Sequence, residues 1–96
     1  MVSAYIIAIA KIIEEPRFKI FDDDIYFTTV KVDLEEFDNI NLNFWGDLAY
    51  SVIENYQVDD YILVEGYISS QENEIYVDSS MLKKITITVL ETVLIY

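Results

Sequence analysis

The chain has 96 residues, of which 53% are hydrophobic, and its 18 acidic and 6 basic residues give a formal net charge of −12. This length supports one hydrophobic core, so we expect a single domain over residues 1–96. Cysteine and histidine are absent, which excludes disulfides, thiolate or imidazole metal sites and histidine-assisted nucleophiles. With only two glycines, a glycine-rich phosphate loop is also excluded. We therefore predict a non-enzyme without cofactor or metal. No apolar run is long enough to predict a membrane span.

The N-terminal third predicts two main strands. Residues 4–13 form a β-branched apolar run, which Pro16 should end. Residues 18–21 are expected to be short and extended, and the acidic residues 22–24 should form a turn. Residues 25–32, rich in Tyr, Phe, Thr and Val, predict the second strand.

In the middle of the chain, the spacing of the apolar residues changes from that of a strand to that of a helix. Residues 40–45 alternate between apolar and other side chains, which predicts a third strand with Ile40, Leu42 and Phe44 on its core face. The next apolar residues follow a helical stripe, formed by Leu48, Ala49, Val52, Ile53 and Tyr56. Asp47 stands where an N-cap or a first-turn acid would favour that helix.

The C-terminal part predicts two more strands. Residues 57–60 should form a turn and residues 61–68 the fourth strand. A hairpin tip is expected at residues 71–73, with residues 75–77 returning from it. Residues 85–90 again alternate and predict the last strand. The whole is therefore an all-β chain with one helix: an OB-fold five-stranded barrel with the helix between strands three and four. An SH3-like barrel fits the strand count but not this helix.

Residues 40–69 carry a family resemblance. An apolar strand ends in Phe44-Trp45-Gly46, a Leu48-Ala49 helix follows, and the next strand ends in Val64-Glu65-Gly66. With the earlier strand and its turn at Pro16, this order resembles the single-stranded DNA-binding protein family of bacteria and organelles, most of all its short plastid-encoded members. Isoleucine and tyrosine are abundant and Lys outnumbers Arg, as expected from an AT-rich genome. We expect a plastid protein or, alternatively, a bacterial cytoplasmic one.

The resemblance implies base stacking on Trp45, with phosphates on Lys11, Arg17, Lys19 and Lys31. The alternation of the strands adds an outward-facing apolar set, whose role is either base stacking or partner binding: Phe27, Trp45, Tyr61, Leu63 and Tyr67. Asp47 stands where the family has a lysine, and residues 58–60 are acidic where the family's turn is basic.

Two functions stay open. The net charge disfavours a polyanionic ligand, so we favour a repurposed barrel that acts as an acidic protein-interaction subunit of a larger assembly, such as a plastid photosynthetic, polymerase or ribosomal complex. The alternative is single-stranded DNA binding on Trp45 in plastid DNA maintenance. Homo-oligomer formation through the first strand is compatible with both.

Overall fold

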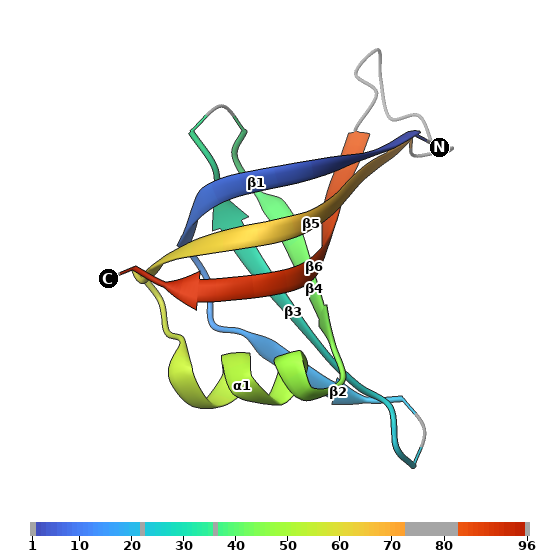
Figure 1. The fold of residues 1–96 in the computed structure, drawn as a ribbon, viewed down its shortest axis with the longest axis vertical. Helices are drawn as coiled ribbons and strands as arrows, with labels where there is room; N and C mark the ends of the chain where they lie inside the picture. Colours follow the sequence, from blue (N-terminus) through green and yellow to red (C-terminus); the bar gives the residue numbers. More distant parts are fainter. Residues whose placement is uncertain (1, 22, 36, 73–82, 96) are drawn as a thin grey trace.

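The computed structural model describes residues 2–21, 23–35, 37–72 and 83–95. Its elements are β1 (Val2–Ile12), β2 (Arg17–Ile20), β3 (Tyr26–Asp33), β4 (Ile40–Trp45), α1 (Asp47–Asn55), β5 (Tyr61–Glu72) and β6 (Lys83–Leu94). The strands follow the order β1-β5-β6-β4-β3-β2, and β1 also pairs with β3. This last pairing, Lys11 with Asp33 and Ile12 with Val32, closes the sheet into a barrel, with α1 across one end (Figure 1).

The barrel has the predicted order of strands, with one strand more than expected. Arg17–Ile20, foreseen only as a short extended segment, is β2 and pairs antiparallel with β3. Three of its four residues are exposed. The sequence therefore lacks the strong apolar alternation that reveals a half-buried strand.

The core follows the alternation of β3 and β4. In β3, Val30 is buried and its neighbour Thr29 points outward. In β4, Leu42 and Phe44 are buried and Asn43 between them points outward. The buried hydrophobic residues described are Ala10, Ile12, Val30, Val32, Leu34, Ile40, Leu42, Phe44, Ala49, Val52, Ile62, Val64, Ile87 and Val89. They come from five of the six strands, from the helix and from the segment after β3, and they include Ile40, Leu42 and Phe44, so the core face predicted for the third strand is confirmed.

Helix α1 is fixed to the barrel by packing and by one buried hydrogen bond. Gly46 precedes it with φ 65°, and Asp47 lies in its first turn rather than at its N-cap. The side chains of Ala49 and Val52, both in α1, are buried against the barrel. The Thr28 hydroxyl of β3 donates to the Ala49 carbonyl at 2.8 Å, which satisfies a buried side chain of the sheet and positions the helix.

The β5–β6 pair corrects one expectation. β5 continues to Glu72, where Gln71 pairs with Lys84, so Gln71 lies in a strand and not in the predicted hairpin tip. The predicted return at residues 75–77 lies outside the described residues. A register shift between Glu65 and Gly66 interrupts this pair. α1, the helix described, is too short to cross a membrane.

Candidate nucleic-acid interface

The outer face of β2, β3 and β4 is arranged in rows across the strands. Antiparallel pairing places Lys19 opposite Phe27, and Phe27 opposite Trp45. A second row, two residues further along β3, consists of Arg17, Thr29, Asn43 and Thr88. A third row consists of Lys31, Asn41 and Thr86. Each row begins with a cation and continues with aromatic, amide or hydroxyl side chains.

An aromatic cluster lies at the end of this face. The Phe27 and Trp45 ring centroids are 4.4 Å apart, and Phe21 stacks on Trp45 at 5.7 Å with an interplanar angle of 14°. Trp45 remains 44% exposed. Because the three rings hold one another in place, Trp45 presents an aromatic surface of restricted orientation, which suits stacking on a planar ligand.

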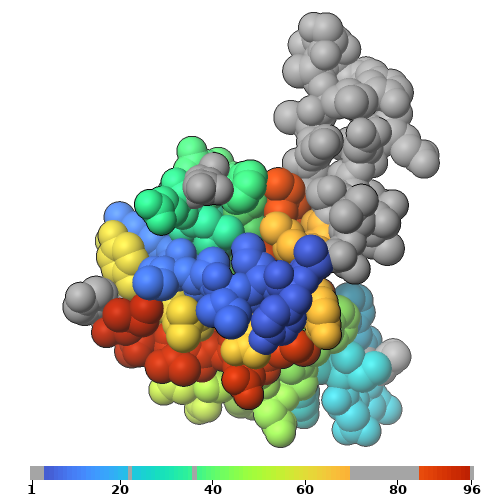
Figure 2. Space-filling view, turned by 45° about the horizontal axis from the view of Figure 1, so that its top comes forward, coloured from blue at the N-terminus to red at the C-terminus, as the bar shows by residue number. Residues whose placement is uncertain are grey.

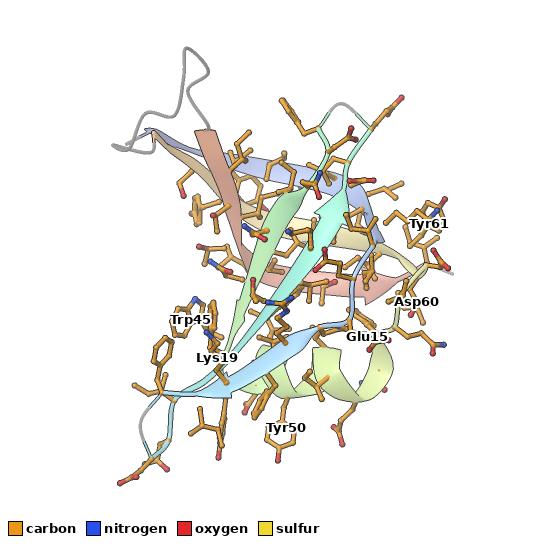
Figure 3. All side chains as sticks on the ribbon, turned by 180° about the vertical axis from the view of Figure 1, so that it is seen from behind. Glu15, Lys19, Trp45, Tyr50, Asp60 and Tyr61 are labelled. Carbon is orange, nitrogen blue, oxygen red and sulfur yellow. The ribbon has the colours of Figure 1, made fainter. Side chains whose placement is uncertain are left out.

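The cations lie alongside these rings and amides. Lys19 and Trp45 are seen on the same side of the molecule in Figure 3. A shallow groove of about 310 Å³ lies beside Lys19 and Phe27, and its lining residues are Lys19, Phe27, Thr29, Asn41, Asn43 and Thr86. Arg17 and Lys31 lie nearer the β1–β2 connection, where both pair with Glu14. The face therefore combines cations with a flat aromatic surface, the two components that single strands require.

Most carboxylates lie away from this face. Along β2, β3 and β4 the only carboxylate is that of Asp33, the last residue of β3, and it accepts the Asn39 N–H at 2.9 Å. Glu14 and Glu15 adjoin one end of the face, and Asp23 and Asp24 lie in the turn of the β2–β3 hairpin. The other described acids lie in the 35–38 loop, on α1, in the 59–60 turn and on β5 and β6. The net charge of −12 is thus a poor guide to the local charge here.

The structure separates the predicted site residues into two groups. Phe27 and Trp45 lie together, with Arg17, Lys19 and Lys31 on the same face. Tyr61, Leu63 and Tyr67 point outward from β5, beside β1, and Figure 3 shows Tyr61 on the opposite side of the molecule from Trp45.

Lys11 belongs with the second group. Its ammonium pairs with Asp59 at 3.8 Å and lies 5.9 Å from the centroid of the Tyr61 ring. It is therefore not part of the rows that lead to Trp45.

Several members of the face were not singled out from the sequence, among them one aromatic residue and two asparagines. Phe21 stacks on Trp45, and Asn41 and Asn43 line the groove. The asparagines belonged to the alternation that predicted the third strand, so their outward orientation was foreseeable. The position of Phe21 depends on the β2–β3 hairpin, in which its N–H donates to the Ile25 carbonyl at 2.8 Å, and no local pattern shows this.

The sequence comparisons support the family resemblance. No protein-family model matches the chain. The chain is 34% identical over 71 residues to the "Putative single-stranded DNA-binding protein ycf41" of Trieres chinensis. That alignment covers 67% of this chain, and the chain spans 63% of the length of that relative.

Solved structures show the same fold. The SSB domain of a Synechococcus protein superposes with a TM-score of 0.71 at 18% identity, covering 92% of this chain and 91% of that one. The second single-stranded DNA-binding protein of Mycobacterium smegmatis gives 0.75 at 19% identity, covering 94% and 84%. The small single-stranded DNA-binding protein of Streptomyces coelicolor gives 0.76 at 12% identity, covering 98% and 95%. The predicted OB-fold class and the resemblance to this family are confirmed.

Proposed function

We propose that this protein binds single-stranded DNA on the outer face of β2, β3 and β4. The observation that carries the proposal is the row in which Lys19, Phe27 and Trp45 lie side by side on three adjacent strands. A base stacks on Trp45, supported by Phe27, while the adjoining phosphate lies by Lys19. Every base has a π-face, so this mode tolerates any sequence.

The remaining rows extend the same path. Arg17 and Lys31 supply further cations for the phosphates. Asn41 and Asn43, which line the groove, each offer an amide that can donate hydrogen bonds to base edges, and the Asn41 amide oxygen can also accept them. Binding of this kind needs no catalytic group and no cofactor.

This proposal reverses the preference that the net charge suggested. The preference for a protein-interaction role assumed that the 18 carboxylates surround the cations evenly. In the described part of the chain, most carboxylates lie away from the rows that contain Arg17, Lys19 and Lys31. The relative and two of the solved structures reported above are described as single-stranded DNA-binding proteins and the third structure as an SSB domain, and none of those descriptions names a role as a subunit of a larger protein assembly. The plastid location, or alternatively the bacterial cytoplasm, stays a prediction.

A direct test compares single and double strands. Fluorescein-labelled oligo-dT and a duplex of equal length are titrated with the protein at low salt, and anisotropy is followed. We expect saturable binding of the single strand and at least about tenfold weaker binding of the duplex, whose bases are unavailable for stacking. Equal affinity for both, or no binding of the single strand, would refute the proposal.

We also propose that two copies associate through β1. Residues 2–10 of β1 pair only with β5 among the described residues, so one edge of the strand keeps its backbone donors and acceptors. Ile7 and Ile9 beside this edge are 58% and 56% exposed. In Figure 2, β1 (blue), β5 (yellow) and β6 (red) lie on one broad face, and in the sheet β5 lies between β1 and β6, so that β1 is the outer strand there. A second copy would pair with the edge and cover the apolar side chains.

Light scattering after size exclusion tests this association. The wild type should elute above the monomer mass, and Ile7→Lys should shift it to the monomer. A monomeric wild type at high micromolar concentration would contradict the association without affecting the proposed DNA-binding face.

A further inference from the structure

Glu14 bridges two cations of the proposed binding face. One carboxylate oxygen, Oε1, lies 3.8 Å from Arg17 Nη2, and the other, Oε2, lies 3.8 Å from Lys31 Nζ. Arg17 belongs to β2 and Lys31 to β3, whereas Glu14 lies in the connection that follows β1. The side chain thus reaches from a loop to the cations of two paired strands.

These groups surround a small hollow. It has a volume of about 120 Å³ and is lined by Glu14, Glu15, Arg17, Thr29, Lys31 and Asn41. Besides the two cations, it offers the Asn41 amide as a neutral donor, while the Thr29 hydroxyl, which also lines it, donates to Asn43 Oδ1 at 3.3 Å. Two cations with a neutral donor beside them are the chemistry that recognises a phosphodiester, whose two non-bridging oxygens share one negative charge. A carboxylate also has two such oxygens, so Glu14 occupies the position that a phosphate would take.

We propose that Arg17 and Lys31 form a phosphodiester subsite and that Glu14 is its internal competitor. This inference rests on the proposed function, because the phosphate is one of the bound DNA strand. Both ion pairs are long, and the three side chains are 37–74% exposed, so water screens them and an incoming phosphate displaces the carboxylate at little cost. Glu14 then sets how strongly the strand is held.

Competition by the Glu14 carboxylate should change how the affinity for DNA depends on salt concentration. A phosphate that binds to free cations releases counterions from the DNA, so affinity falls as salt rises. Where the phosphate must first displace Glu14, the freed carboxylate attracts a cation from solution, and part of this release is cancelled. The logarithm of affinity should therefore fall less steeply with the logarithm of salt in the wild type than in a variant without the carboxylate.

The test uses Glu14→Gln with Glu15→Gln as its matched control. Both variants remove one negative charge from the lining of the same hollow, and Glu15 has no ion pair within the described part of the chain. We expect Glu14→Gln to bind oligo-dT about three- to fivefold more tightly than the wild type, with a salt slope steeper by up to about 0.7. Glu15→Gln should stay within about twofold of the wild type.

Equal gains in both variants would show a general charge effect and would overturn the inference. Unchanged or weaker binding by Glu14→Gln would overturn it as well. Thermal melting of each variant verifies that the fold is retained. In these outcomes the wild type still binds the strand, so the proposed function stands while the inference fails.

A second arm measures the subsite without DNA. Inorganic phosphate is added to the ¹⁵N-labelled proteins, and the amide signals of Thr29 and Asn41 and the Arg17 Nε signal are followed. Larger shifts in Glu14→Gln than in Glu15→Gln would support competition between the Glu14 carboxylate and phosphate. This would hold even if neither variant nor the wild type bound oligo-dT, a result that would refute only the proposed function. Identical shifts in the two variants refute the competitor.

Discussion

Phe27 and Trp45 lie directly opposite each other on β3 and β4, with ring centroids 4.4 Å apart and an interplanar angle of 50°. The pairing fixes the tryptophan on the outer face of the sheet, while its strand neighbour Phe44 is fully buried on the other side. One six-residue strand thereby builds part of the core and presents the proposed stacking surface.

Trp45→Ala should weaken binding of labelled oligo-dT by at least about fivefold, since stacking contributes about 1–3 kcal/mol per base. The measurement is fluorescence anisotropy at fixed low salt. Tyr61→Ala removes an aromatic ring from the other side of the barrel and serves as the control, with binding expected to stay near that of the wild type. Equal losses of affinity in the two variants would show that Trp45 is not part of the binding face.

Lys19→Glu should lower the affinity by at least about fivefold and make the salt slope shallower, because one phosphate contact contributes about 0.7 to the slope for single strands. Lys11→Glu makes the same change in net charge. Lys11 pairs with Asp59 beside Tyr61, so its reversal should leave the slope unchanged. The affinities are compared over a series of salt concentrations. If both reversals change the slope alike, binding follows total charge and not the rows described here.

Gly66→Ala should destabilise the barrel strongly. A Cβ at Gly66 would lie 2.1 Å from the Thr88 carbonyl oxygen and 2.9 Å from its carbon. These are backbone atoms of β6, so relief requires the β5–β6 pairing to shift. We expect a loss of at least about 3 kcal/mol in the free energy of unfolding. Chemical denaturation followed by circular dichroism measures it.

Gly46→Ala is the companion variant. No atom lies within 4 Å of its added Cβ, so the cost comes only from the backbone conformation of Gly46, φ 65° and ψ −132°, and should be about 1–3 kcal/mol. A loss at Gly46 equal to or larger than the loss at Gly66 would contradict the close approach of β5 and β6.

Thr28→Val should reduce stability by about 1–2 kcal/mol, because it deletes the hydroxyl that donates to the Ala49 carbonyl. Thr29→Val, the next residue, removes an outward-facing hydroxyl whose hydrogen bond to Asn43 Oδ1 is longer, at 3.3 Å, and only partly buried, so it should cost about 0.5 kcal/mol or less. Urea denaturation distinguishes the two. Equal costs would mean that the buried hydrogen bond does not help to hold α1 on the barrel.

The sequence predicted the fold well wherever one face of an element is buried. Ile40, Leu42 and Phe44 alternate strictly because the core admits one face of β4. β2 was not recognised as a strand because most of its side chains are exposed. The polar end of β5 resembled a turn, although Gln71 pairs with β6.

The candidate site was only partly predictable. The outward orientation of Trp45 follows from period two alone. Its partners do not, since Lys19 and Phe27 reach it through strand register, and register depends on the whole sheet. The bridge from Glu14 to Lys31 joins residues whose proximity no local pattern reveals.

The measurement that tests the central claim most directly is the fluorescence of Trp45, the single tryptophan of the chain, during titration with unlabelled oligo-dT at low and at moderate salt. The proposed function predicts saturable quenching as bases stack on the indole, with weaker affinity at moderate salt. A signal that stays flat at low salt, where binding is most favoured, would contradict it.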